Sequence, residues 1–302
     1  MALAADNRQA RLALAFASDG YLLCKGFFAD EIAMLSALVD RQADRLLARE
    51  DITIDSSGAG ASNLGYLGKG DDVIAAFART ARLVGLARDL LGDDVYLLKG
   101  RLNIKWGDAA PDRRGGWDPH QDRAAWAREG LPGAAALTVA IAVDDSRLEN
   151  GTLEVVPGSH RGGILEHSAI DAGYGLREEL FAPLVEKHGR LALDMAAGDM
   201  VVFSGDLVHM SRPNTGTPRR TLLFLTYNAL GNSPPEGVGP SRYHASAAID
   251  ARDDAVLAEL AREFRAGRYA PDIDWDAVGR ERELDIAEGV DSGWSDLTPT
   301  LR

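Results

Sequence analysis

The sequence holds a single cysteine, Cys24, among its 302 residues. One cysteine forms no internal disulfide, and it excludes zinc sites built from several cysteines. Because Cys24 ends the apolar run Tyr21-Leu22-Leu23-Cys24, we expect it to be a small buried hydrophobe. Long apolar runs are also missing, since none approaches the ~18 residues of a membrane span. No positively charged start followed by an apolar core marks a secretion signal. We therefore expect a cytoplasmic protein without a membrane partner.

Positive charge is scarce as well. The chain has 33 Lys and Arg against 46 Asp and Glu, and a formal net charge of −13. A duplex-binding protein needs clustered Lys and Arg to neutralise phosphates, so this balance disfavours a nucleic acid as partner. The glycine-rich segment 53–70 lacks Walker spacing, because Lys69 is followed by glycine and not by Ser or Thr. We interpret this segment as a loop that does not bind phosphate.

The pattern of apolar residues changes near residue 93. Before it, three segments carry apolar residues at helical spacing (5–17, 32–47 and 72–92), with Asp30 as the expected cap of the second helix and a short strand over 21–24. After it come short segments rich in β-branched and aromatic residues: 96–106, 137–143, 153–156, 191–195, 200–203 and 221–227. Helices followed by many short strands predict a mostly β protein with packed helices. Its core would be a double-stranded β-helix, a cupin-like jelly roll that encloses a ligand cavity.

We expect a single domain over residues 1–302. Its parts are N-terminal helices over about 5–92, the jelly-roll core over about 93–230 and a C-terminal extension over about 231–302. Within the extension, an alanine-rich pattern predicts a polar helix over 246–268, followed by an acidic, irregular tail. Two less regular segments are candidate lids over the cavity mouth: 157–190 and 229–244.

His120 and Asp122 lie two residues apart, just after a loop rich in Gly and Pro. In an extended segment, residues i and i+2 point to the same side, so both side chains can bind one metal ion. A second histidine, His209, follows the apolar run 200–203. Two neutral imidazoles and one carboxylate, with open positions, suit a non-haem Fe(II) that also binds a co-substrate and O2. Alone, a His-X-Asp pair is more often a hydrogen-bonded surface pair. Whether this pair binds metal is therefore judged from the residues around it.

Arg220 and Ser211 add a second feature. Arg220 opens the strand expected over 221–227, and Ser211 lies two residues after His209, so it faces the same way in an extended stretch. An arginine in a closed cavity near iron binds a carboxylate in a bidentate manner. The remote carboxylate of 2-oxoglutarate fits this pair. The neighbouring Arg219 could as easily be solvated.

These motifs, in this order, resemble the phytanoyl-CoA dioxygenase (PhyH) family of Fe(II)/2-oxoglutarate oxygenases. The resemblance covers about residues 15–230. It is carried by His120-Gln121-Asp122, by the run Glu149-Asn150-Gly151-Thr152-Leu153-Glu154-Val155-Val156-Pro157-Gly158-Ser159-His160, by Gly198-Asp199 before an apolar strand, and by His209 with Ser211 and Arg220. The opening Gly20-Tyr21-Leu22 with Gly26-Phe27-Phe28 also fits.

The resemblance implies that iron is held by His120, Asp122 and His209, and that Arg220 and Ser211 hold the side-chain carboxylate of 2-oxoglutarate. Gln121 matches a family position near the co-substrate. Strand alternation leaves it open whether Thr138 and Lys105 face the same pocket. The implied reaction is hydroxylation of an unactivated C–H bond of a small molecule, with release of succinate and CO2. Related halogenases carry a small residue at the position of Asp122, so its presence favours hydroxylation over halogenation.

Alternatives remain open at this point. Desaturation, cyclisation and epimerisation begin from the same oxidising chemistry. A cupin-like protein that binds a small ligand without turnover is a second class, but it has no need for Arg220 and Ser211. The chain offers no obvious basic cluster for the phosphates of coenzyme A, so a free small molecule is the favoured substrate. The sequence predicts neither its identity nor the oligomeric state.

Several neighbouring residues have ordinary explanations. We expect His160 to belong to a turn set by Pro157 and Gly158 rather than to bind metal. Solvated surface positions are expected for the remaining histidines, His167, His188 and His244. Trp117 and Trp126 fit either a pocket wall or the core. Arg123 fits either a contact to an acidic substrate or a surface salt bridge.

Overall fold

The computed structural model describes residues 2–48, 52–54, 60–170, 173–245 and 247–288. Within them, the strands form one larger sheet, one smaller sheet and a two-stranded hairpin, all paired antiparallel. The larger sheet has the order β1 (Tyr21–Cys24), β11 (Met200–Ser204), β6 (Ala136–Ala142), β13 (Arg220–Ala229), β4 (Val95–Lys105), β3 (Gly60–Leu64) and β2 (Ile52–Ile54). The smaller sheet has the order β10 (Leu191–Ala192), β7 (Leu153–Val155), β12 (His209–Ser211) and β5 (Trp117–His120). The hairpin is β8 (Ser168–Ile170) with β9 (Gly173–Gly175).

The central strands of the larger sheet are buried on both faces. Every residue of β6 and β13 is buried, and alternate residues enter different cores, because successive side chains of a strand point to opposite faces. Leu137, Val139 and Ile141 belong to the core under the helices. Ala140 and Ala142 belong to a core shared with the smaller sheet. The mostly β fold with packed helices and a jelly-roll core is confirmed.

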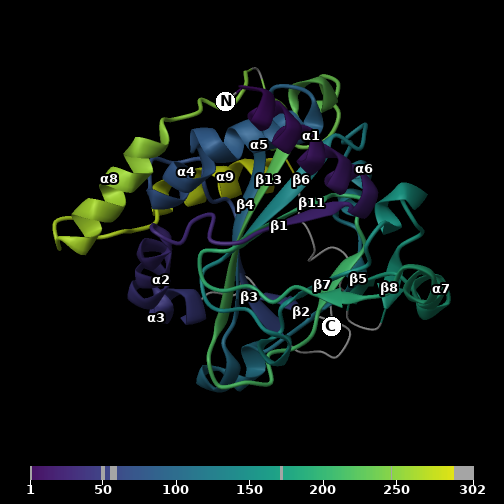
Figure 1. The fold of residues 1–302 in the computed structure, drawn as a ribbon. Helices are drawn as coiled ribbons and strands as arrows, with labels where there is room; N and C mark the ends of the chain where they lie inside the picture. The colour runs from purple at the N-terminus through teal and green to yellow at the C-terminus, as the bar shows by residue number, and fades with distance from the viewer. Residues whose placement is uncertain (1, 49–51, 55–59, 171–172, 246, 289–302) are drawn as a thin grey trace.

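Helices cover the outer face of the larger sheet. In Figure 1 several of them lie on one side of β4 and β13, while β5 and β7 lie on the other, together with the helix Glu178–His188 (α7). The core beneath them draws its helical residues mainly from α2 (Ile32–Arg41), α4 (Val73–Ala78), α5 (Ala81–Leu91), α8 (Asp254–Arg265) and α9 (Trp275–Ala287). The remaining helices are α1 (Ala2–Asp19), α3 (Ala43–Ala48), α6 (Asp122–Arg128) and α7 (Glu178–His188). In the described part of the chain, no helix is long and apolar enough to cross a membrane.

Some local predictions were wrong. The second helix begins at Ile32 with Glu31 as its N-cap and no side-chain cap bond, so Asp30 does not cap it. The predicted loop 53–70 contains β3, which pairs with β4; residues 55–59 lie outside the described residues. The helix predicted over 246–268 is the shorter α8, and α9 forms in the tail that was expected to be irregular. Cys24 is half-buried against the helical core.

Gly198 and Asp199 form the turn that leads into β11. Gly198 has a φ of 89°, and a Cβ there would lie 2.7 Å from Cα of Ala29, so only glycine fits without a shift. The buried carboxylate of Asp199 accepts hydrogen bonds from the backbone N–H groups of Gly26 (2.6 Å) and Ala196 (2.8 Å) and from Nζ of Lys25 (2.9 Å). Gly198 and Asp199 therefore hold the turn before β11 against residues 25–29.

We expect Asp199→Asn to lower the free energy of unfolding by about 1–3 kcal/mol, the usual cost of leaving buried hydrogen-bonding groups unsatisfied. Burial raises the pKa of Asp199, but the bonds from Gly26, Lys25 and Ala196 lower it by more, so the pKa lies below its ordinary value. The ionised carboxylate thus stabilises the fold above the ordinary carboxyl pKa, and this contribution is lost as pH falls through the lowered pKa. Urea unfolding of both proteins should show their difference shrinking on acidification. A difference independent of pH would contradict this role.

Candidate metal centre

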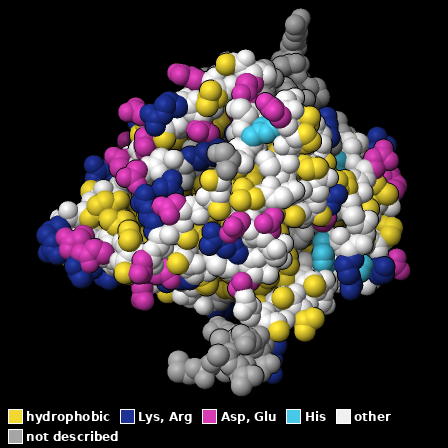
Figure 2. Space-filling model, turned by 90° about the horizontal axis from the view of Figure 1, so that it is seen from above, with side chains coloured by type: hydrophobic (Ala, Val, Ile, Leu, Met, Phe, Trp, Pro, Cys, Tyr) yellow, Lys and Arg dark blue, Asp and Glu magenta, His cyan; other side chains and the backbone are white. Residues whose placement is uncertain are grey.

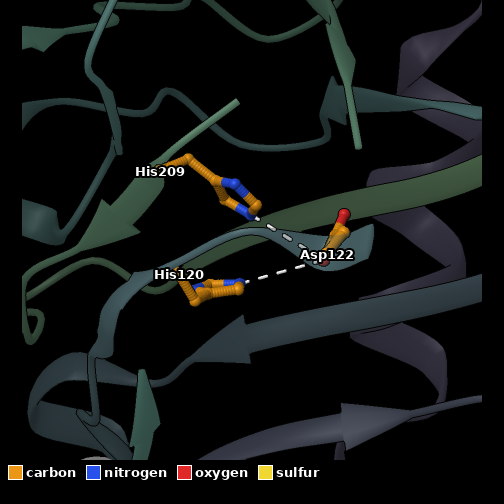
Figure 3. A group of neighbouring side chains, drawn as sticks. All are labelled: His120, Asp122 and His209. Atoms are coloured by element: carbon orange, nitrogen blue, oxygen red, sulfur yellow. Dashed lines mark ion pairs between the residues drawn. The ribbon is translucent and has the colours of Figure 1, made fainter. Parts of the chain in front are cut away.

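Three buried side chains meet inside the jelly roll, as Figure 3 shows. His120 ends β5, Asp122 begins α6, and His209 begins β12. Gln121 between the first two is extended (φ −118°, ψ 126°), which places His120 and Asp122 on the same side, as their spacing predicted. His209 is the direct partner of His120 across the strand pair. The fold thus brings His209, from a distant part of the sequence, to the pair His120 and Asp122.

The three side chains have the geometry of a metal site. Oδ1 of Asp122 lies 3.8 Å from Nε2 of His120 and 3.9 Å from Nε2 of His209. One ligand atom from each residue falls within 4.8 Å of the others, and all three residues are at most 4% exposed. Two imidazoles and one carboxylate are the donor set of non-haem Fe(II) sites. The residues present therefore fit this metal.

Hydrogen bonds fix the orientation of both imidazoles. Nδ1 of His120 lies 2.7 Å from the carbonyl oxygen of Asp118, and Nδ1 of His209 lies 3.0 Å from that of Leu207. A carbonyl accepts only from a protonated nitrogen, so each Nδ1 carries the hydrogen and each Nε2 offers its lone pair. Burial lowers the pKa of both histidines, that of His120 well below its ordinary value. Both rings are neutral at pH 7, as metal binding requires.

Asp122 is held in its ionised form by its surroundings. Burial raises its pKa, but His209, Arg101, His120 and the hydroxyl of Thr138 lower it by more, so the pKa lies below its ordinary value. Oγ1 of Thr138 donates to Oδ2 of Asp122 at 3.1 Å, which leaves Oδ1 directed at the imidazoles. The sequence left open whether Thr138 faces inward. It does, and its hydroxyl binds Asp122. Its contact with the co-substrate stays a prediction.

A second buried cluster contains Arg220, Lys105 and Ser211. Nε and Nη2 of Arg220 donate to the carbonyl oxygen of Gly151 at 3.0 and 2.7 Å, and Nζ of Lys105 donates to it at 3.3 Å. Lys105 also donates to Oγ of Ser211 at 2.7 Å. A Cβ on Gly151 would lie 2.3 Å from the carbonyl oxygen of Arg212, so glycine is required at this position. Lys105, whose orientation was left open, thus connects Ser211 with the carbonyl group that Arg220 binds. That these residues bind the co-substrate stays a prediction.

The Arg220 guanidinium is a buried cation whose hydrogen-bond acceptors are all neutral. Arg220 is 1% exposed, and burial lowers its pKa. Its third bond, from Nη1, goes to Oδ1 of Asn103 at 2.9 Å. Among the described residues, no carboxylate lies within ion-pair distance of Arg220. A buried charge without a counterion is costly, so this cluster fits an anionic ligand.

Asn103 is a site residue that the sequence analysis missed. It is 1% exposed, it orients Arg220, and its Nδ2 has no hydrogen-bond partner among the described residues. Lys105 and Arg101 lie two residues on either side of it along β4. The alternation of polar side chains over residues 99–105 was the available signal, since such residues share one face of a strand.

Arg101, also unpredicted, lies over two aromatic rings and is close enough to Asp122 to lower the pKa of that residue. Its Cζ is 5.1 Å from the ring centre of Trp117 and 5.0 Å from that of Phe224. Burial lowers the pKa of Arg101, and Asp122 acts in the opposite direction. The ring of Trp117 also lies 5.7 Å from that of His120, so the guanidinium and Trp117 both lie near the metal centre. Trp126, by contrast, packs into a separate core.

Gln121 is buried beside the metal centre, but its amide is bound to backbone. Nε2 donates to the carbonyl oxygens of Gly163 (2.8 Å) and Asp206 (2.6 Å), and Oε1 accepts from the N–H of Leu165 (2.8 Å). These contacts use both donors and one acceptor position. The position of Gln121 near the co-substrate stays a prediction. What the structure assigns to it is a link between the metal motif and the segment around residues 163–165.

Three of the other four histidines have a hydrogen-bond partner in the backbone. His167 is half-buried and its Nε2 accepts from the N–H of Gln121 at 2.9 Å, so the expected solvated position was wrong. His160 binds the carbonyl oxygen of Ala17 at 3.1 Å, which fits the turn predicted for it. His244 binds the carbonyl oxygen of Val238 at 2.9 Å.

Two arginines also have definite partners. Arg123 pairs with Asp206 at 2.7 Å, in line with the salt bridge weighed for it. Arg219 is not solvated: it pairs with Asp144 at 3.0 Å and with Asp40 on α2. It therefore points toward the helical side of the sheet, away from Arg220.

The C-terminal extension contacts the helix of the metal motif. Glu129, directly after α6, accepts from the hydroxyl of Tyr243 and lies 3.3 Å from Nζ of Lys99. Tyr243 is fully buried, and Arg242 beside it pairs with Asp285 of α9. The extension thus supports α6 from behind. Whether the segments 157–190 and 229–244 act as lids stays a prediction.

A jelly roll that holds two histidines and an aspartate around one point, beside a buried arginine with neutral partners, defines a non-haem iron oxygenase of the 2-oxoglutarate-dependent class. The chain belongs to the phytanoyl-CoA dioxygenase (PhyH) family, whose model matches residues 16–222. This membership, together with the His-Asp-His site, confirms the predicted class of enzyme and its Fe(II), 2-oxoglutarate and O2.

Named relatives agree with this class. The chain is 33% identical to the ectoine dioxygenase of Sphingopyxis alaskensis over 254 residues, which cover 77% of this chain and 80% of that one. It is 35% identical to the L-proline trans-4-hydroxylase of Streptomyces griseoviridis over 186 residues, 56% of this chain and 68% of that one. Two solved structures of EctD from S. alaskensis also match, and each match covers 81% of this chain and 87% of that one. The structure with bound Fe has a TM-score of 0.66 at 31% identity. The structure with 2-oxoglutarate and 5-hydroxyectoine has a TM-score of 0.68 at 29% identity.

Proposed function

We propose that this protein hydroxylates an unactivated C–H bond of a small, carboxylate-bearing molecule. His120, Asp122 and His209 would hold Fe(II) through Nε2, Oδ1 and Nε2. Arg220, Lys105 and Ser211 would bind the remote carboxylate of 2-oxoglutarate. The observation that carries the proposal is the pairing of a buried His-Asp-His group with a buried guanidinium whose partners are neutral. When bound, iron and 2-oxoglutarate supply the oxidation, with O2 consumed and succinate and CO2 released.

The residues around the site orient the predicted metal ligands and exclude water. The carbonyl groups of Asp118 and Leu207 hold the imidazoles in one tautomer, and Thr138 holds the carboxylate. The ring of Phe203 lies 4.7 Å from that of His209, which keeps water from that side. A preoriented, water-poor site needs little rearrangement when its ligands arrive.

Arg101 supports a carboxylate-bearing substrate. Its guanidinium lies over Trp117 and Phe224 and acts on the nearby Asp122. Among the described residues no carboxylate pairs with it within 4 Å. A guanidinium recognises a carboxylate through two parallel hydrogen bonds. Proline, named in one relative, carries such a group. The guanidinium therefore favours a small polar substrate over a long acyl chain.

The surface charge and the cysteine content bear on the kind of partner and on the location of the protein. On the face drawn in Figure 2, Lys and Arg side chains alternate with Asp and Glu side chains, so the charge there is mixed. This supports a small molecule, rather than a nucleic acid, as the partner. One cysteine in the whole chain is compatible with a cytoplasmic location.

The test is succinate formation from 2-oxoglutarate with Fe(II) and ascorbate, over a panel of amino acids and cyclic amino acids and their carboxamides. We expect a free acid to stimulate succinate formation and to gain one oxygen atom by mass spectrometry.

Arg101→Met should raise the KM for that acid by about tenfold or more, because a hydrogen bond to a charged group contributes about 1.5–3 kcal/mol. It should leave 2-oxoglutarate affinity unchanged. Equal rates with acid and carboxamide would contradict the substrate class. No succinate with any compound would favour a binding protein.

A further inference from the structure

Residues 163–170 and 173–176 run along the free side of β5, and we call them the strap. β5 pairs with β12 on its other side. The N–H of Leu176 donates to the carbonyl oxygen of Pro119 at 2.7 Å. A Cβ on Gly175 would lie 2.6 Å from that same oxygen, so the approach depends on glycine. The strap therefore packs directly on the segment that carries the metal motif.

The strap also forms hydrogen bonds with Gln121, the residue between the predicted ligands His120 and Asp122. The side chain of Gln121 is fully buried and binds the backbone of Gly163 and Leu165. Its backbone N–H donates to Nε2 of His167 at 2.9 Å, and Nδ1 of His167 lies 2.9 Å from the carbonyl oxygen of Leu165. His167 thus carries its hydrogen on Nδ1 and accepts at Nε2. Both the side chain and the backbone of Gln121 are tied to the strap.

A small apolar core anchors the strap itself. Leu176 and Phe181 are buried together with Val156, Val208 and Met210, and Leu165 packs against them. Val208 and Met210 flank His209 in the sequence. The same core therefore holds the strap and the strand of the third predicted ligand, so their relative position is fixed by packing.

We propose that His167 is a positioning residue for the metal centre. Through the N–H of Gln121 it sets the backbone between His120 and Asp122, and so the angle at which their side chains meet the ion. This inference rests on the proposed function, because it requires that the two residues bind metal. His167 does not touch the ion or the substrate in this role. It acts on the ligands by orienting the residue between them. Loss of a hydrogen-bond partner that orients metal ligands costs about 10- to 100-fold in metal affinity.

The test compares His167 variants by metal binding rather than by turnover. The dissociation constant for Mn(II) and the visible absorption spectrum of the Co(II)-loaded protein report affinity and ligand geometry separately. His167→Ala should weaken Mn(II) binding by about 10- to 100-fold and change the Co(II) spectrum. His167→Gln, whose amide oxygen reaches the N–H of Gln121, should restore both. His244→Ala, which also removes a histidine bonded to a backbone carbonyl, should behave as the wild type.

The outcomes separate the two proposals. If the wild-type protein binds neither Mn(II) nor Co(II) at this site, the proposed function fails. If it binds them and His167→Ala matches its affinity and spectrum, only the positioning role fails. Should His167→Ala not fold, His167→Asn replaces it, because its shorter side chain places the amide short of the N–H of Gln121. Equal behaviour of the Asn and Gln variants would overturn the positioning role, and a wild-type spectrum in the Gln variant alone would support it.

Discussion

Replacing Asp122 by alanine is expected to abolish hydroxylation and to weaken Fe(II) binding by more than about 100-fold. Loss of an outer-shell partner already costs up to about 100-fold, and Asp122 would supply the only anionic ligand atom of the group. Its Oδ1 lies within 4 Å of both Nε2 atoms, so its removal leaves two neutral imidazoles to hold a divalent cation. Calorimetric titration of the apoprotein with Fe(II) or Mn(II) under nitrogen measures the affinity. Product formation at saturating 2-oxoglutarate measures the activity.

A graded series makes this prediction specific. Thr138→Val removes the hydroxyl that donates to Oδ2 of Asp122 but keeps the volume, so its loss of affinity should fall between the wild type and Asp122→Ala. Asp112→Ala removes a carboxylate that is 78% exposed and should change nothing. Asp122→Asn keeps the shape of the side chain and separates the loss of charge from the cavity left by alanine. Full hydroxylase activity in Asp122→Ala would overturn the ligand assignment.

The part of this centre that the sequence predicted is the part built from local geometry. His120 and Asp122 share one side because Gln121 is extended, and an i, i+2 spacing states that directly. The pairing of His209 with His120 is a contact between distant strands. The place of His209 after the apolar run 200–203 made it a candidate ligand, and the resemblance to a known family supported that choice. Asn103 was missed because its role depends on the register of β4 and β13, in which Arg220 faces Lys105.

Two of the wrong predictions share a physical cause. β3 has the sequence Gly-Ala-Ser-Asn-Leu, which has little strand propensity of its own, and it becomes a strand by pairing with β4. His167 lies in an irregular segment with no periodic pattern, so nothing local indicated that its ring would reach the metal motif. In both cases tertiary contacts decided the outcome. The same holds for the strap, whose place is set by an apolar core assembled from four separate segments.

Arg220→Leu is expected to raise the dissociation constant for 2-oxoglutarate by about 30-fold or more, since truncating one partner of a buried charge pair costs about 2–5 kcal/mol. Arg220 is 1% exposed and donates to Gly151 and Asn103, so its guanidinium is already oriented before an anion binds. Metal affinity should be retained, because Arg220 belongs to a different cluster from the His-Asp-His group. Calorimetric titration of 2-oxoglutarate into the Mn(II)-loaded protein under nitrogen checks this.

The adjacent Arg219 provides the matched control. It pairs with Asp144 and Asp40 on the opposite side of the sheet, so Arg219→Leu should lower stability without changing the affinity for 2-oxoglutarate. Lys105→Met should weaken binding less than Arg220→Leu, because Lys105 reaches the cluster through Ser211 and Gly151 as a single point charge. Arg220 and Lys105 share the carbonyl of Gly151, so the loss in the double variant should differ from the sum of the single losses. An unchanged affinity in Arg220→Leu, or an equal loss in Arg219→Leu, would place the carboxylate of the co-substrate elsewhere in the cavity.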